Sequence, residues 1–87
     1  MMFIIFAYDV EEKRTDKARK IVKKYLAPIQ RSLFHGYLSE KQLFRLKSEI
    51  SRVIDKELDS VTIYKFNEET PDIEELGLIQ NHDRFIL

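Results

Sequence analysis

The sequence contains no cysteine and no tryptophan, and it has only two glycines and two prolines among its 87 residues. The absence of cysteine excludes a disulfide framework, a zinc site with thiolate ligands and a cysteine nucleophile. Two glycines are too few for a glycine-rich loop that binds phosphate through its backbone, and the motifs of such loops are missing. No apolar run approaches the roughly 20 residues of a membrane-spanning helix, and no secretory leader is recognisable. We therefore expect a cytoplasmic protein with no membrane partner.

The composition is that of one small globular domain. Hydrophobic residues make up 44% of the chain, and six phenylalanines and four tyrosines supply bulky side chains for a core. A domain of this size buries only about 60–65% of the surface that its unfolded chain exposes. Burial of additional surface against a partner subunit would therefore stabilise it.

The formal net charge is zero, but the charges are unevenly distributed along the chain. Between Lys13 and Arg31 there are eight basic residues and one acid, whereas residues 68–75 contain five acids and no base. Such a dipolar surface can attract a polyanion to one side of a neutral protein. The charge pattern also fits a helix whose lysines simply face solvent, and charge alone does not separate the two interpretations.

The first half of the chain predicts a strand, a helix and an extended segment. The continuous apolar run 2–8 is typical of a strand that is covered on both faces, and Asp9 is the first polar residue after it. Thr15 is a plausible N-cap for a helix that ends before Pro28. The apolar residues of that helix recur on one face, at Ala18, Ile21, Val22, Tyr25 and Leu26. Residues 29–38 read as extended, and we expect Gly36 to divide them into two short strands.

The second half predicts another helix and another strand. Ser39 and Gln42 form a capping-box pattern before a helix that extends to about residue 56, and residues 61–66 alternate as a strand does. The order β-α-β(β)-α-β predicts an α+β, ferredoxin-like fold: an antiparallel sheet with both helices on one face.

We assign residues 1–66 to the core of the fold and residues 67–87 to a C-terminal tail of the same domain. The tail begins with acidic residues, and we expect a helical turn at 72–76. It ends with the apolar segment 85–87, which requires burial. That segment could add an edge strand to its own sheet or pair with the sheet of a partner.

Asp9 is the strongest candidate for chemistry, because no local catalytic motif is present and neither His35 nor His82 lies near a carboxylate pair in sequence. A carboxylate at the end of a central strand has a rigid support. Mg²⁺ typically uses only one or two protein carboxylates, together with water and phosphate oxygens. One Asp9 from each of two chains could therefore be sufficient for a shared metal site that orients a phosphate. The residues leave open that Asp9 only ends the strand or caps the next loop.

Three residues of the second extended segment are candidates for contacts with nucleic acid. Arg31 could bind a phosphate, Ser32 could donate a hydrogen bond, and Phe34 could stack on a base or pack in a dimer interface. The alternative for Phe34 is an ordinary place in the core. The pattern of three exposed aromatic residues that marks an RNA-recognition motif is absent.

Three segments together resemble one known family. They are the strand ending Phe6-Ala7-Tyr8-Asp9-Val10, the run from Ile29 to Leu38, and the strand beginning Asp59-Ser60-Val61-Thr62-Ile63-Tyr64. In this order and spacing they resemble the small CRISPR-associated protein two family, the partner of the CRISPR integrase in spacer acquisition. The resemblance covers about residues 2–66. The chain departs from the family pattern at Pro28, where many members have a basic residue, and at Arg31, where an aromatic residue is common.

The resemblance implies a homodimer whose two sheets face each other, with the C-terminal segment paired to the sheet of the neighbouring subunit. It also implies a Mg²⁺-dependent endonuclease acting on single-stranded RNA or double-stranded DNA. Asp9 would be the metal ligand and catalytic residue, and Arg14 and Arg31 would be phosphate contacts, with Ser32 and Phe34 as further nucleic-acid contacts.

Two functional alternatives remain open beside the endonuclease. The first is a non-catalytic, architectural dimer that bridges integrase subunits and spacer DNA. The second is a regulatory domain that binds a small ligand, which leaves the basic helix unexplained.

Overall fold

Two helices and five strands make up the described part of the chain, which in the computed structural model comprises residues 1–67 and 71–77. In chain order they are β1 (Met2–Asp9), α1 (Glu12–Val22), β2 (Ala27–Gln30), β3 (Leu33–Leu38), α2 (Glu40–Ser51), β4 (Ser60–Phe66) and β5 (Pro71–Gly77). None of the helices in these residues is long and apolar enough to cross a membrane.

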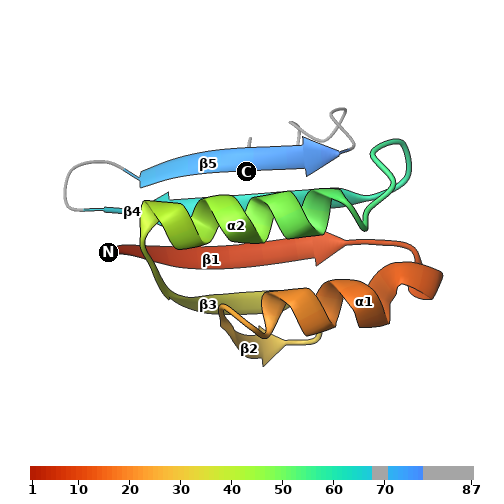
Figure 1. Cartoon of the computed structure of the whole chain (residues 1–87), viewed down its shortest axis with the longest axis horizontal. Helices are drawn as coiled ribbons and strands as arrows, with labels where there is room; N and C mark the ends of the chain where they lie inside the picture. The colour runs from red at the N-terminus through yellow and green to blue at the C-terminus, as the bar shows by residue number, and fades with distance from the viewer. Residues whose placement is uncertain (68–70, 78–87) are drawn as a thin grey trace.

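The strands form one antiparallel sheet in the order β2-β3-β1-β4-β5, so β1 lies at its centre between β3 and β4. Both helices lie on the same face of this sheet (Figure 1). The predicted ferredoxin-like arrangement is therefore confirmed, and β5 is added to it at the edge beside β4.

The two faces of β1 differ in burial, which corrects the expectation that both faces are covered. Ile4, Phe6 and Tyr8 point to the helices and are buried, because side chains alternate along a strand. Phe3 and Ile5 point to the opposite face and are only half-buried. The run is continuously apolar because the second face of β1 also carries apolar side chains, although the helices of this chain do not cover that face.

The helices bury the parts of the predicted stripes that they contain, but both end earlier than expected. α1 ends at Val22, so Tyr25 and Leu26 follow it, and α2 ends at Ser51 instead of near residue 56. Ala18 and Val22 of α1 and Leu43, Leu46 and Ile50 of α2 are buried in the core. The predicted capping box is also present: the Gln42 amide donates to the Ser39 hydroxyl at 3.2 Å, and the Ser39 amide donates to the Gln42 side-chain oxygen at 2.9 Å. Tyr25 and Lys24 both donate hydrogen bonds to the Glu49 carboxylate and so connect the segment that follows α1 to α2.

The start of α1 and the division of the second extended segment differ from the sequence predictions. The N-cap of α1 is Glu11, and the Thr15 hydroxyl donates to the Glu11 carbonyl at 3.3 Å from inside the helix. Gly36 does not divide the strands, because it lies within β3 opposite Ile4. The chain instead turns at Arg31 and Ser32, between the paired residues Gln30 and Leu33.

The segment expected to form a helical turn at 72–76 belongs to strand β5 instead. Its alternating residues meet different surroundings: Glu74 pairs with Lys47 at 3.0 Å and with Lys65 at 3.4 Å, whereas Ile73 is exposed on the other face. These cross-strand and helix contacts outweigh the weak local helical preference. The predicted role of residues 85–87 lies outside the described part of the chain.

Candidate active site at the end of the central strand

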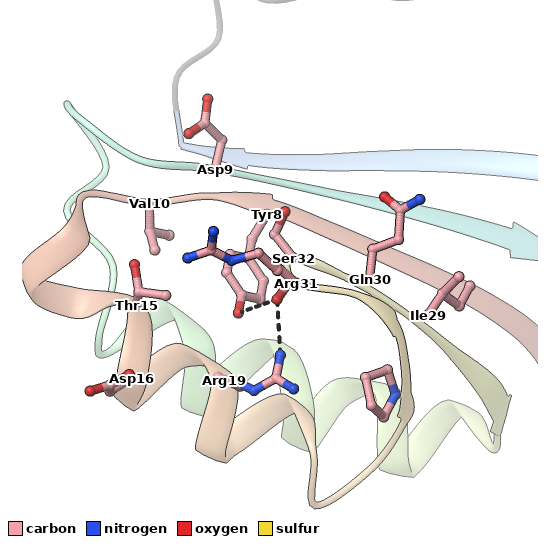
Figure 2. Close-up of a pocket in the computed structure, with 11 residues that line it drawn as sticks. Tyr8, Asp9, Val10, Thr15, Asp16, Arg19, Ile29, Gln30, Arg31 and Ser32 are labelled. Atoms are coloured by element: carbon pink, nitrogen blue, oxygen red, sulfur yellow. Dashed lines mark hydrogen bonds between the residues drawn. The ribbon is translucent and has the colours of Figure 1, made fainter.

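Asp9 is the last residue of β1 and pairs across the sheet with Ser60, the first residue of β4. Its side chain is exposed. Figure 2 shows the carboxylate on the side of β1 that faces away from α1. The sequence predicts this position at the strand end, and the structure adds that it lies at the border of the uncovered sheet face.

Asp9 lines a cleft of about 770 Å³ that is formed by the end of β1, one side of α1, strand β2 and the β2–β3 turn. Arg31 and Ser32 line the same cleft from the turn, and both are exposed. Asp16 and Arg19 line it from α1 (Figure 2). The structure therefore brings together three of the predicted site residues: Asp9, Arg31 and Ser32.

The turn that carries Arg31 and Ser32 is held through its backbone. The Arg31 carbonyl accepts a hydrogen bond from Arg19 Nη1 at 3.0 Å and from the Tyr8 hydroxyl at 3.4 Å, as the dashed lines in Figure 2 show. Burial raises the pKa of Tyr8, and the neighbouring Arg19 partly offsets this effect, so the phenol remains a hydrogen-bond donor at neutral pH. Tyr8 and Arg19 are functional supports that the sequence analysis missed.

Phe34 lies in the core, which was the alternative for this residue. Its ring is completely buried, stacks on the Tyr8 ring at a centroid distance of 5.9 Å, and has the Arg19 guanidinium 5.5 Å from its centroid. A ring enclosed in this way has no face available to a base. Its contribution to the cleft is to support the residues that hold the turn.

Arg14 forms a hydrogen-bonded ion pair with a buried acid and does not line the cleft. Its Nε donates to Asp59 Oδ2 at 2.6 Å and its Nη2 donates to Asp59 Oδ1 at 2.9 Å. Burial by itself would raise the pKa of Asp59, but hydrogen bonds from Arg14 and two backbone amides lower it to about 2. Asp59 in turn raises the pKa of Arg14. The prediction that Arg14 contacts phosphate therefore conflicts with the fixed position of its guanidinium.

The donor set around Asp9 suits a hydrated, oxygen-ligated ion. The described residues include no group of three or more His, Cys, Asp or Glu side chains that could enclose a metal. Asp9 itself carries an exposed carboxylate, which is a hard oxygen ligand of the kind that hydrated cations accept. Such a ligand suits a hard, hydrated cation better than a metal that prefers several nitrogen or sulfur ligands.

Comparison with known proteins identifies relatives along most of the chain. The family model described as CRISPR associated protein Cas2 matches residues 2–72. The CRISPR-associated endoribonuclease Cas2 of Thermotoga maritima is 42% identical over 86 residues, which cover 98% of this chain and 99% of that protein. The CRISPR-associated endoribonuclease Cas2 3 of Thermodesulfovibrio yellowstonii is 47% identical over 64 residues, which cover 74% of this chain and 73% of that protein.

Solved structures agree with the sequence relatives. A structure described as the crystal structure of cas2 superposes with a TM-score of 0.73 at 36% identity, covering 92% of this chain and 91% of that one. The Streptococcus pyogenes Cas2 structure at pH 6.5 has a TM-score of 0.63 at 21% identity, with 99% and 96% covered, which supports the fold alone. Because the family model and these relatives span most of its residues, the chain belongs to the CRISPR associated protein Cas2 family.

Proposed function

We propose that this protein is a CRISPR-associated, Mg²⁺-dependent endonuclease that cleaves phosphodiester bonds in single-stranded RNA or double-stranded DNA and acts with the CRISPR integrase in spacer acquisition. The observation that carries the proposal is the placement of an exposed carboxylate, Asp9, on the rim of a cleft that it shares with Arg31 and Ser32. The names of the relatives favour RNA as the substrate.

The residues of the cleft have complementary roles in this proposal. Asp9 would hold the ion, which when bound supplies positive charge to the scissile phosphate and a water of lowered pKa. Arg31 binds the phosphate backbone by charge-assisted hydrogen bonds, and the Ser32 hydroxyl donates a further hydrogen bond. Lys13, Lys17 and Lys20 are exposed on α1 and attract the polyanion to this side of the molecule.

The uncovered sheet face supports a homodimer as the active form. Asp9 lies at the end of this face, in the same strand alternation as Phe3 and Ile5. When two subunits pack through this face around a twofold axis, these apolar side chains are buried. The same packing places the Asp9 strand ends of both subunits in one assembly. A single carboxylate per chain then contributes to a site that both subunits line.

One observation favours the architectural alternative, in which the dimer binds the integrase and duplex DNA without cutting. Asp9 has no cluster of further acids around it among residues 1–67 and 71–77, whereas many nucleases hold two metal ions with several carboxylates. The basic side of α1 and the uncovered sheet face serve the bridging role equally well.

The decisive experiment measures Mg²⁺-dependent cleavage of labelled single-stranded RNA and duplex DNA. We compare the wild type with Asp9→Asn, and we use Glu12→Gln as the matched control because Glu12 is an exposed acid three residues along that does not line the cleft. Asp9→Asn should lower the cleavage rate at least about a hundredfold, within the usual contribution of a positioned reacting group. Glu12→Gln should cleave as the wild type does, and a chelator should abolish cleavage by both.

Light scattering on each variant shows whether it still forms the same oligomer as the wild type. Cleavage lost by a still-dimeric Asp9→Asn protein supports the nuclease. A wild type that binds duplex DNA without cleaving either substrate, or equal cleavage by Asp9→Asn, contradicts the nuclease proposal. The first of these two results favours the architectural role.

A further inference from the structure

Asp59 is a completely buried acid whose carboxylate is fully engaged by hydrogen bonds. Besides the two bonds from the Arg14 guanidinium, it accepts one from the Glu11 amide at 2.9 Å and one from the Asp55 amide at 2.8 Å. The Arg14 Nη2 also donates to Glu11 Oε1 at 3.0 Å. One carboxylate thereby connects the start of α1 to the loop between α2 and β4.

The Arg14–Asp59 cluster holds the two chain segments next to Asp9: the residues that follow it and the residues that precede its cross-strand partner. Glu11, whose amide is bound, follows Asp9 by two residues, and Asp59 directly precedes Ser60, the cross-strand partner of Asp9. The end of β5 packs against the same point. Gly77 adopts a φ of +92°, and a Cβ at this position would lie 2.0 Å from the Asp59 carbonyl oxygen. Three segments that are distant in sequence therefore meet where β1 ends.

We propose that Arg14 and Asp59 are positioning residues, which fix the chain on both sides of the Asp9–Ser60 pair and so set the direction of the Asp9 carboxylate. This inference rests on the proposed catalytic role of Asp9. It assigns Arg14 a role in the reaction that does not require contact with the nucleic acid.

The chemistry of the pair suits a positioning role better than a purely stabilising one. A buried ion pair adds little stability over a well-packed apolar pair at the same place, because the desolvation of both charges offsets much of their attraction. An arginine–carboxylate pair fixes the relative orientation of the two groups, because the planar guanidinium can donate two hydrogen bonds only to a carboxylate in a narrow range of orientations. A misplacement of about 1 Å at a reacting group can cost on the order of a hundredfold in rate.

The chain offers a matched control for the loss of an inter-element acid. Glu49 also joins separate elements by accepting hydrogen bonds from Tyr25 and Lys24, and it does not line the cleft. A change at Glu49 weakens the attachment of the segment after α1 to α2, whereas a change at Asp59 weakens the support of the β1 end. The comparison therefore separates general destabilisation from loss of positioning.

The test uses the full-length variants Asp59→Asn, Arg14→Gln, the double variant and Glu49→Gln. Arg14→Lys is added as the mildest variant, because lysine keeps the charge and loses only the fork. Two quantities are measured under conditions where each variant is folded: hydrogen exchange of the amides of Glu11 and Ser60, and kcat separately from KM for cleavage. Variants that do not fold are excluded, and Arg14→Lys then supplies the comparison.

Loss of the pair should speed exchange of the Glu11 amide at least about tenfold, because its hydrogen-bond acceptor is lost or displaced. It should lower kcat about tenfold or more with KM within about twofold, because binding of the nucleic acid does not use the pair. The double variant should be no slower than the slower single variant, since the two residues act as one unit. Glu49→Gln should leave both the Glu11 exchange and kcat close to the wild-type values.

Unchanged exchange at Glu11 in a folded Asp59→Asn or Arg14→Lys protein overturns the proposal. It is also overturned if kcat falls only in proportion to the folded fraction, as a purely structural role requires. If the wild type does not cleave nucleic acid, the proposed nuclease function fails by itself. The amide exchange then decides whether the pair fixes the strand end.

Discussion

The two faces of the sheet differ in how completely one chain can bury them. On the helix side Ile4 and Phe6 of β1 are fully buried, and so is Ile63 of β4. On the other side Tyr37 is 67% exposed and Phe66 is 39% exposed. Both faces carry apolar side chains at strand spacing, but the two helices cover only one of them (Figure 1). A hydrophobic strand pattern therefore indicates which side chains must be buried but not which chain buries them.

The residues of the candidate site are also divided between the two faces of the sheet. Asp9 lies at the border of the uncovered face, whereas Tyr8 and Arg19 support the cleft from the helix side. The proposed catalytic residue and the residues that hold the cleft in place thus come from opposite sides of the sheet. Substitutions on the helix side should change folding, and substitutions on the uncovered face should change assembly.

The largest effect is expected for Phe6→Ala on the helix side. Phe6 lies opposite Phe34 and Ile63 in the sheet and is fully buried, so its removal leaves a cavity that the core cannot refill. We expect a loss of about 3–5 kcal/mol in the free energy of unfolding, measured by urea titration. Phe66→Ala on the uncovered face should cost about half as much or less. Equal losses would show that the two faces are buried to the same degree in solution.

A smaller loss of stability is expected when Asp59, the buried acid that binds Arg14, is protonated at low pH. The folded state lowers the pKa of Asp59 from 3.8 to about 2, so the ionised form contributes stability above pH 4. This contribution, on the order of 2 kcal/mol, is lost as the pH falls from about 4 to about 2. Urea titrations at several pH values should show this loss in the wild type. Asp59→Asn should be less stable at neutral pH and should lack this part of the acid dependence; an unchanged acid dependence would assign it to other carboxylates.

The smallest effect on folding is expected for Tyr37→Thr on the uncovered face. Threonine keeps the preference for a strand, and the ring of Tyr37 is mostly exposed, so the stability of the dilute protein should change by less than about 1 kcal/mol. In the proposed dimer the same ring is buried, and self-association should weaken about tenfold. Sedimentation over a range of concentrations measures this change. An unaltered dimer would place the subunit interface elsewhere.

Much of the fold could be predicted because it is determined by local patterns. The apolar run of β1, the buried stripe of α1, the Ser39–Gln42 capping box and the alternation of β4 all depend on residues that are close in sequence. The position of Asp9 at a strand end follows from the same reasoning, since it is the first polar residue after the run. These features fixed the order of the elements and the two-layer arrangement.

The wrong predictions share a different cause. Thr15 has the chemistry of an N-cap, but the helix begins earlier, at Glu12, because the Glu11 amide is bound by Asp59 from a distant loop. Residues 72–76 have a weak helical pattern, yet pairing with β4 makes them a strand. In both places a contact between distant residues outweighs a local preference.

The supports of the site could not be found from sequence for the same reason. Arg14 and Asp59 are 45 residues apart and belong to no local motif. A charged residue at the start of a buried strand was the one available signal, since a buried acid requires a partner. Identifying Arg14 as that partner among the many basic residues of α1 required the three-dimensional structure.

The way in which the β2–β3 turn is anchored determines how freely the residue at its tip can be exchanged. Tyr8 and Arg19 hold the turn through the carbonyl of Arg31, a group that every amino acid carries. The side chain at position 31 is exposed and does not contribute to that anchor. Arginine can therefore be exchanged for a residue of another size or charge while the turn keeps its shape. A substitution at position 31 therefore alters the chemistry of the cleft without disturbing the architecture beneath it.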